Sequence, residues 1–453
     1  MVYHCAETWI NMTDTPKDPD GSAVPHSRLS RLAGLGGMAA GIAGGVALHG
    51  VRQLAAGKRP KASDLFLTPK NAMKLTRQLS QMRGAAMKIG QMISMESNDF
   101  LPKEFADILA RLRADAKHMP RKQLLKVLDE AWGRGWRAKF KSFDMQPIAA
   151  ASIGQVHRAE MPDGTQLAIK IQYPGVRDSI DSDVKNVAAL LRMSGLVPAN
   201  LDIAPVIEEG RKQLHQEADY EREAAYLQRF GDALSSEEPF HVPSFYPAIS
   251  TDKVLAMSYC EGVPIEDMAD APQETRNLIV QTLMTLTLRE LFDLRVMQTD
   301  PNFANYQYNT DTAEIVLLDF GASRDIEQPV TDAYHALMAA ALSGDAEATF
   351  DAAVEIGFIP ADMKATHRSV ILELIELIIE PLTRDEPFDF GDPSLAQELR
   401  DKAMPLATKR DLWHVPPTEM IFIQRKLGGM YMLATRLKAV VGVRALLEEF
   451  VGN

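Results

Sequence analysis

The sequence has little cysteine, and this excludes a fold built around disulfide bridges. Among its 453 residues only Cys5 and Cys260 are cysteines, and their spacing matches no metal-binding motif. Such a composition is typical of proteins in a reducing compartment. Positive charge is not in surplus either, because 49 Lys and Arg residues stand against 61 Asp and Glu residues and leave a formal net charge of −12. A chain of that charge would repel phosphates, so we expect no nucleic-acid partner.

The N-terminal region lacks the basic segment and apolar core of a secretory signal peptide. Residues 1–27 are polar and contain prolines, and we expect a disordered tail. The uncharged stretch 32–48 carries Gly37, Gly41 and Gly45 at every fourth position, which places these glycines on one face of a helix. In a bilayer such a face lets two helices approach closely and would support a homodimer. Because the stretch is slightly short for a span of about 20 residues, a flexible linker and a short helix packed on the protein remain alternatives.

Hydrophobic content of 46% and charged content of 24% are ordinary for a soluble globular protein, and the length predicts about two to four domains. From about residue 61 to 140 the apolar spacing predicts helices, including one over 121–132 that follows Pro120. Within this region the segment MKIGQM places Lys88 and Gln91 three positions apart, on the same side of a helix. From their chemistry alone, these two side chains form a polar patch that faces water.

Residues 156–160 and 166–172 predict a β-hairpin around a Pro-Asp-Gly turn. Lys170 is an isolated charge within the apolar second strand. A buried lysine needs an anionic partner, because an unpaired ammonium is costly to bury. An edge-strand lysine that faces water is the alternative. A loop of small residues at 149–152 precedes the hairpin, and this is the arrangement of a kinase N-lobe.

An acidic cluster follows in the helical region 176–232. Its sequence EADYEREA contains Glu217, Asp219 and Glu223, and we expect this cluster to lie within one helix. Acidic runs on helices usually face solvent, but Lys170 makes one of these glutamates a candidate partner. Strands are then predicted over 241–262, and they end in MSYCEG at the expected hinge between two lobes.

Residues 298–321 contain three groups suited to a nucleotide triphosphate. Asp300 and Asn305 have the spacing D-x-x-x-x-N, and Asp319 opens an Asp-Phe-Gly turn after a short apolar strand. Phosphoryl-transfer sites of the kinase kind need a carboxylate near the attacking group, and a carboxamide and a second carboxylate on Mg²⁺. Each motif alone is only moderately specific. Helices are predicted around this stretch over 277–294, 330–342 and 419–437.

Several motifs in order carry a resemblance to a known family. They are MKIGQM, PIAAASIGQVH, AIKIQYPGV, EADYEREA, MQTDPNFAN, LLDFGASRD and IQRKLGG. With these motifs the chain resembles the UbiB/AarF family of atypical protein-kinase-like proteins, in the branch that bacteria and mitochondria share and that supports ubiquinone biosynthesis. The resemblance covers nearly all of residues 65–445.

The resemblance implies an α+β, protein-kinase-like two-lobed fold with a small β-rich N-lobe, a helical C-lobe and an N-terminal helical extension that carries the KxGQ motif. The expected parts are a disordered tail (1–27), a glycine-rich segment that associates with a membrane (28–60), the helical KxGQ extension (61–140), the N-lobe with a helical insertion (141–260) and the C-lobe (261–453).

The resemblance also implies roles for individual residues. Lys170 would contact the nucleotide phosphates with Glu223 as its ion-pair partner, Asp300 would be the catalytic aspartate, and Asn305 and Asp319 would bind the metal. The remaining expected site residues are Ala149, Ala150, Ala151 and Ser152 over the phosphates, Met257 and Tyr259 beside the nucleotide, and a regulatory set of Lys88 and Gln91 with Glu217 and Asp219.

Two departures from ordinary protein kinases stand out. The phosphate loop reads AAAS instead of a glycine-rich sequence, and Gln298-Thr299-Asp300 replaces His-Arg-Asp. Each alanine adds a Cβ where glycine lets backbone amides close on phosphates, so nucleotide preference should differ. The resemblance therefore implies an ATPase or small-molecule kinase that uses ATP or ADP with Mg²⁺ in ubiquinone biosynthesis. A true protein kinase and a nucleotide-gated scaffold for biosynthetic enzymes are the alternatives.

The expected partners are the nucleotide, a membrane lipid or quinone precursor, and the enzymes of quinone biosynthesis. The expected location is the bacterial cytoplasm, in association with the inner membrane.

Overall fold

A computed structural model describes residue 79 and residues 82–96, 118–194, 203–234, 239–407 and 417–452. The predicted tail and the glycine-rich segment with Gly37, Gly41 and Gly45 lie outside these residues. The chain divides into two compact units. Unit 1 comprises the described residues up to Ala218 together with Pro247–Ala256, and unit 2 comprises Asp219–Tyr246 and the described residues from Met257 onward. The expected domain boundaries stay predictions.

Unit 1 contains an antiparallel sheet in the order β1-β3-β4-β6, with β2 also paired to β3. The predicted hairpin is confirmed: its strands are β3 (Gly154–Glu160) and β4 (Gln166–Gln172), and Gly164 turns the chain with a φ of 93°. The other strands are β1 (Ser142–Phe143), β2 (Ala149–Ala150) and β6 (Val254–Ser258). Two strands therefore flank β4, which is not an edge strand.

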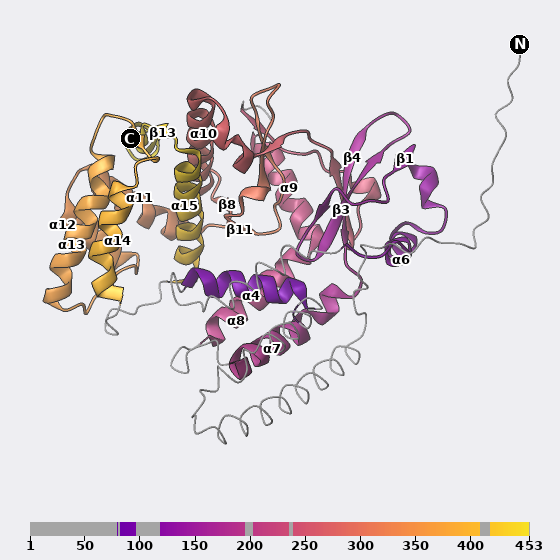
Figure 1. Cartoon of the computed structure of the whole chain (residues 1–453), viewed down its shortest axis with the longest axis horizontal. Coiled ribbons are helices and arrows are strands. Elements are labelled where there is room, and N and C mark those ends of the chain that lie inside the picture. Colours follow the sequence, from indigo (N-terminus) through magenta and orange to yellow (C-terminus); the bar gives the residue numbers. More distant parts are fainter. Residues whose placement is uncertain are drawn as a thin grey trace, which may run out of the picture. The chain divides into compact units, whose positions relative to one another are not determined.

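Four helices of unit 1 lie among its described residues. They are α4 (Arg83–Glu96), α6 (Arg121–Trp132), α7 (Val176–Ser194) and α8 (Ala204–Glu217), with short 3-10 turns at Trp136–Lys139 and Pro247–Ile249. The helix predicted after Pro120 is confirmed as α6. Helix α4 packs against α7 and α8, as Figure 1 shows. This three-helix group presents the MKIGQM segment to the rest of unit 1.

Unit 2 begins with α9 (Tyr220–Leu234), and here the structure corrects the sequence. We expected the acidic cluster to continue through one helix, but α8 ends at Glu217 and α9 begins at Tyr220. Asp219 accounts for the break, because its Oδ1 accepts a hydrogen bond from the Arg222 backbone N–H (3.1 Å) and so caps the new helix. Glu217 and Glu223 consequently lie in different helices.

The rest of unit 2 is mainly helical, with small sheets between the helices. Its strands are β5 (Phe240–His241), β7 (Val263–Pro264), β8 (Val296–Gln298), β9 (Tyr306–Tyr308), β10 (Ile315–Leu317), β11 (Ser323–Asp325), β12 (Phe388–Asp389) and β13 (Val440–Val441). Its α-helices are α10 (Gln273–Phe292), α11 (Gln328–Leu342), α12 (Ala346–Glu355), α13 (Ala365–Ile379), α14 (Ser394–Ala407), α15 (Thr418–Leu437) and α16 (Val443–Val451), and 3-10 turns lie at Ile265–Asp270, Phe303–Asn305 and Glu380–Leu382. The three helices predicted here are confirmed as α10, α11 and α15.

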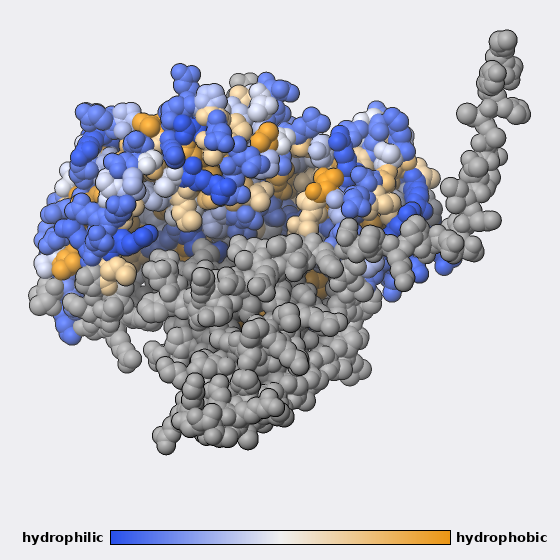
Figure 2. All heavy atoms as spheres, in the orientation of Figure 1, coloured by the Kyte–Doolittle hydropathy of each residue, from blue (hydrophilic) through white to orange (hydrophobic). Residues whose placement is uncertain are grey.

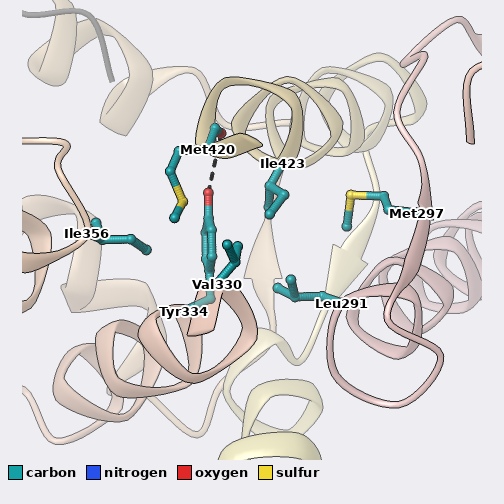
Figure 3. Packing of buried hydrophobic residues seen from close by; sticks show 7 residues of the cluster. All are labelled: Leu291, Met297, Val330, Tyr334, Ile356, Met420 and Ile423. Carbon is teal, nitrogen blue, oxygen red and sulfur yellow. Dashed lines mark hydrogen bonds between the residues drawn. The ribbon is translucent and has the colours of Figure 1, made fainter. Parts of the chain in front are cut away.

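The core of unit 2 lies where α10, α11 and α15 meet β8. Figure 3 shows the ring of Tyr334 extending from α11 toward α15, where its hydroxyl donates a hydrogen bond to the Met420 carbonyl (3.4 Å). The buried members of this cluster are Leu291, Met297, Val330, Tyr334, Ile356, Met420 and Ile423. Burial of this apolar surface holds α15 beside α10 and β8, which matters for the site described below.

On the face drawn in Figure 2, most of the described surface is hydrophilic. On the face in Figure 2 hydrophobic side chains form small separate spots among hydrophilic ones. Single exposed apolar residues such as Leu278 and Met432 are ordinary in folded proteins. None of the helices in the described ranges is both long and apolar enough to cross a membrane.

Candidate functional site

A short β-ladder in unit 2 brings the segment that carries Asp300 next to the segment of the Asp-Phe-Gly turn. Strand β8 pairs antiparallel with β11, in the register Gln298 with Ser323. One step further, the backbone N–H and the hydroxyl of Thr299 both donate to the Ala322 carbonyl (3.2 and 2.7 Å). The ladder thus carries Asp300 to the strand that follows the Asp-Phe-Gly turn.

A second ladder places Asn305 next to Asp319. Strand β9 starts directly after Asn305 and pairs with β10, and the Leu318 N–H donates to the Asn305 carbonyl (3.0 Å). The Asn305 amide Nδ2 lies 3.5 Å from the Asp300 carbonyl. A cavity of about 10 Å³ lies against both Asn305 and Asp319, with room for about one water molecule. The structure therefore gathers Asp300, Asn305 and Asp319 at one edge of unit 2.

Glycine at position 321 lets two carboxylates lie against the turn. A Cβ atom there would lie 3.2 Å from Asp319 Oδ1 and 3.5 Å from Glu223 Oε2. Asp319 Oδ1 accepts the Gly321 N–H (2.9 Å), and Glu223 is 1% exposed. Helix α9 is held here by Arg222, whose guanidinium donates to the carbonyls of Gly321 (2.9 Å) and Ser323. Glu223 is thus fixed beside the Asp-Phe-Gly turn.

The donor set at this edge suits Mg²⁺ brought in with a nucleotide. Asn305 and Asp319 offer a carboxamide and a carboxylate, the hard oxygen ligands that Mg²⁺ prefers, and phosphates and waters usually complete its octahedron. No group of three or more His, Cys, Asp and Glu residues with metal-binding geometry occurs in the described part of the chain. The residues present therefore fit a metal that is shared with phosphates.

In unit 1, Lys170 lies in a setting that excludes one of its two predicted environments. The residue sits in β4 opposite Val156 of β3, and it is 8% exposed. Because β4 has strands on both sides, an edge lysine that faces water is ruled out. The pairing of Lys170 with Glu223 stays a prediction, since the two residues belong to different units.

The predicted phosphate loop is part strand and part turn. Ala149 and Ala150 form β2, where they pair with Val156 and Gln155 of β3. The Ala151 N–H closes the turn onto the Gly154 carbonyl (2.9 Å), and Ser152 lies within the turn. The segment therefore forms a hairpin whose tip is Ala151–Ile153, and its assignment to the nucleotide stays a prediction.

The MKIGQM helix contacts this hairpin directly. Lys88 is 4% exposed and forms an ion pair with Glu217 at the end of α8, so the expected water-facing patch is wrong for Lys88. The Ser152 hydroxyl donates to the other Glu217 oxygen (2.9 Å). Near the start of α4, a Cβ on Gly84 would lie 3.2 Å from the Ser152 carbonyl, so helix and turn touch. The Gln91 backbone lies in α4, but its side chain lies outside the described part of the chain.

The two residues predicted to lie beside the nucleotide, Met257 in β6 and Tyr259 just after it, differ in exposure. Met257 is 6% exposed and forms a β-bridge with Phe245, whereas Tyr259 is half-buried. Burial raises the pKa of the neighbouring Cys260 thiol. Asp219, assigned to the regulatory set, acts structurally as the cap of α9.

Sequence reasoning missed two charged residues that contact the segment 298–306, which carries Asp300 and Asn305. Glu290 of α10 and Lys426 of α15 form a buried ion pair (3.0 Å) next to Gln298 and Tyr306. The helical spacing could have indicated both residues, because Glu290 occupies a position in the apolar pattern of α10 and Lys426 occupies one in that of α15. A charge on the core face of a helix indicates a buried partner.

A larger cavity of about 440 Å³ lies elsewhere in unit 2. It is lined by apolar residues of α10, α13, α14, α15 and α16, among them Leu288, Leu399, Leu427 and Leu446. None of the predicted site residues lines it.

Comparisons with known proteins agree with the fold and the motifs. A family model described as the ABC1 atypical kinase-like domain matches residues 111–353. Over 432 residues the chain is 39% identical to "Atypical kinase COQ8, mitochondrial" of Saccharomyces cerevisiae, which covers 94% of this chain and 85% of the yeast protein. It is 38% identical over 428 residues to "Atypical kinase COQ8B, mitochondrial" of Rattus norvegicus, covering 94% of this chain and 81% of the rat protein.

A solved structure is also similar. The Rv3197–erythromycin complex from Mycobacterium tuberculosis aligns with a TM-score of 0.60 at 27% identity, over 84% of this chain and 96% of that one. The protein-kinase-like α+β fold is therefore confirmed.

The matches contradict the expected localisation. We expected the bacterial cytoplasm at the inner membrane, but the relatives are mitochondrial proteins of eukaryotes. The bacterial assignment was wrong because the motifs behind it are shared by bacterial and mitochondrial branches and do not separate them.

Proposed function

The chain belongs to the ABC1 atypical kinase-like family, and from this premise we propose that it is an Mg²⁺-dependent ATPase or small-molecule kinase that supports ubiquinone biosynthesis at a membrane. The observation that carries the proposal is the convergence of Asp300, Asn305 and Asp319 at one edge of unit 2. Phosphoryl transfer asks little covalent chemistry of a protein, so such a set acts by positioning and by charge stabilisation.

Each residue has a defined task in this proposal. Asn305 and Asp319 would hold Mg²⁺, which neutralises charge on the phosphates of ATP. Asp300 would orient or deprotonate the attacking water or hydroxyl. Lys170 would neutralise the phosphates further, and the family resemblance assigns Glu223 as its partner. The task of Lys170 comes from the family resemblance, and the structure places this residue, buried, in a central strand.

The contacts of α4 favour an ATPase or small-molecule kinase over a kinase for protein substrates. Lys88, Glu217 and Ser152 join helix α4 to the tip of the alanine hairpin. In ordinary kinases that tip is a mobile cover over the phosphates. A phosphate-covering hairpin that is held by an additional helix supports a site whose nucleotide preference differs from that of ordinary kinases. The partners we propose are a membrane lipid or quinone precursor and enzymes of quinone biosynthesis.

The test compares Asp319→Asn with the surface control Asp311→Asn in the full chain. We expect ATP hydrolysis to fall by about 10²-fold or more in Asp319→Asn, because the carboxylate that would hold Mg²⁺ on the reacting phosphates is lost. Asp311 lies in the exposed turn between β9 and β10, so its variant should match the parent. Equal hydrolysis by Asp319→Asn and the parent would remove the assignment.

A complementation experiment separates the alternatives. Quinone intermediates are measured in a deletion strain that carries the parent, Asp300→Asn or Asp319→Asn. Loss of quinone with both variants supports chemistry at this site, whereas normal quinone with Asp300→Asn would favour a nucleotide-gated scaffold. Transfer of label from ATP to a partner protein, dependent on Asp300, would favour a protein kinase.

A further inference from the structure

Two helices of unit 2 each place a charged side chain inside the core. Glu290 on α10 and Lys426 on α15 are both 1% exposed, and their charged groups lie 3.0 Å apart. Burial alone would lower the pKa of Lys426, but Glu290 and Tyr306 outweigh it and raise that pKa above its ordinary value. Burial raises the pKa of Glu290, against the pull of Lys426. The lysine therefore stays an ammonium that needs acceptors.

The two hydrogen-bond acceptors of Lys426 lie at the two ends of residues 298–306, the segment that carries Asp300 and Asn305. Its ammonium donates to the Gln298 carbonyl (3.0 Å) and to the Tyr306 hydroxyl (2.7 Å). Glu290 Oε1 accepts the Gln298 N–H (3.4 Å), and the Tyr306 hydroxyl donates to Gln298 Oε1 (3.4 Å). Gln298 lies two residues before Asp300, and Tyr306 directly follows Asn305. One ion pair thus holds both ends of the segment that carries these two site residues.

The same helix also contacts the middle of the segment. A Cβ atom on Gly429 of α15 would lie 2.5 Å from Cβ of Pro301, which is far inside the contact distance of two carbons. Glycine is therefore required for α15 to approach Pro301 this closely. Lys426 and Gly429 are three positions apart on the helix and face the same segment.

Stability alone does not account for a buried ion pair here. Apolar side chains lie close to it, since Phe230, Leu286 and Leu317 line the same small cavity as Glu290. In such surroundings a well-packed apolar pair is often as stable as an ion pair or more stable. What an apolar pair cannot do is donate hydrogen bonds to a backbone carbonyl and a hydroxyl at defined points.

We propose that Glu290 and Lys426 form a positioning pair that fixes Gln298 and Tyr306 and thereby sets the placement of Asp300 and Asn305. This inference rests on the proposed function, because it assigns a task to the support of that site. Neither member of the pair is a catalytic residue. The inference also gives a physical task to the IQRKLGG motif.

Three variants of the full chain test the inference. They are Lys426→Met, the double variant Glu290→Gln/Lys426→Met, and Tyr306→Phe. The matched control is Arg436→Met, because Arg436 lies on the same helix but forms an exposed ion pair with Glu266 (2.8 Å). The readouts are thermal unfolding, kcat and KM for ATP hydrolysis, and amide hydrogen exchange of residues 298–306 without nucleotide.

We expect Lys426→Met to lower Tm, because it leaves Glu290 buried without its partner. The double variant should regain most of that Tm while its kcat stays about tenfold or more below the parent, since small misplacements of reacting groups are costly. Exchange at residues 298–306 should remain faster than in the parent, and KM should change little. Tyr306→Phe should lower kcat and speed exchange with a smaller loss of Tm than Lys426→Met, because Lys426 keeps Glu290 and the Gln298 carbonyl.

The inference is overturned if the double variant or Tyr306→Phe has both the kcat and the hydrogen exchange of the parent, because the pair would then only stabilise the core. Failure of the proposed function looks different. In that case the parent shows no ATP hydrolysis that depends on Asp319, while exchange at residues 298–306 still decides whether the pair holds the segment.

Discussion

The ion pair between Lys88 and Glu217 allows a quantitative prediction, because its breakage should destabilise unit 1. The perturbation is Lys88→Met, which keeps the length of the side chain and removes the charge. Lys88 is 4% exposed and Glu217 is 15% exposed, so water screens the pair weakly. After the substitution Glu217 keeps the hydrogen bond from the Ser152 hydroxyl (2.9 Å) and a small contact with water.

The magnitude follows from these surroundings. At an effective dielectric constant of about 20, charges about 4 Å apart attract by about 4 kcal/mol, and desolvation of both groups opposes this. Removal of one partner from a fully buried pair costs about 3–5 kcal/mol. Because Glu217 keeps one donor and some exposure, we expect a loss of about 2–3 kcal/mol. For a unit of about 150–250 residues this lowers Tm by about 4–12 °C.

The assay is urea unfolding followed by tryptophan fluorescence. In a Trp9→Phe/Trp413→Phe background the remaining Trp132 and Trp136 lie in unit 1 and report on it. The control is Lys126→Met, since the Lys126–Glu130 pair is 3.9 Å apart with both side chains largely exposed. Such a pair contributes about 0–1 kcal/mol. If Lys88→Met unfolds like this control, the Lys88–Glu217 pair does not stabilise unit 1.

Four further predictions concern single positions. Burial lowers the pKa of His157 in the folded state. The stabilising effect of this residue is therefore present above the unfolded pKa of about 6.5 and is lost as pH falls below that value, so the unfolding free energy of unit 1 should drop in that range. His157→Gln should remove this part of the pH dependence. Ala150→Gly should change the affinity for ATP or ADP, measured by calorimetry, and equal binding by variant and parent would count against a phosphate-covering hairpin. Gly428→Ala should stabilise α15 by about 1 kcal/mol, because nothing lies near its new Cβ. Gly429→Ala should destabilise by about 1–3 kcal/mol through its clash with Pro301 and lower ATP hydrolysis, and a stabilised Gly429→Ala would refute the close contact.

Local patterns predicted the elements that depend on local chemistry. The β3–β4 hairpin has alternating strands around a turn glycine, and α6 starts after Pro120, so both were predictable from short windows. The break between α8 and α9 was missed because EADYEREA has good helix formers throughout. The cap by Asp219 and the hydrogen bond from Gln172 to the Ala218 carbonyl (2.9 Å) decide it instead, and Gln172 lies far away in sequence.

The motifs of the site could be predicted from the sequence, but the residues that hold these motifs in place could not. Asp300, Asn305 and Asp319 lie close in sequence and share one edge through short ladders. Lys88 was assigned to water from its chemistry, and only the family resemblance suggested its partner Glu217. Glu290 and Lys426 were missed, because their pairing depends on the packing of α10 against α15, which no local window contains.

The long sequence separation between Lys426 and its hydrogen-bond acceptors also has a consequence for how the chain folds during its synthesis on the ribosome. Its two acceptors, Gln298 and Tyr306, lie 128 and 120 residues earlier. At ribosomal rates of about 5–20 residues per second, those residues are made roughly 6–26 seconds before the lysine that they bind. During this interval Glu290 has no Lys426 to pair with, and residues 298–306 lack the contacts that Lys426 makes at both of their ends. The nascent chain would therefore be inactive and exposed to chaperones until α15 has been made, even though the matched family region ends at residue 353.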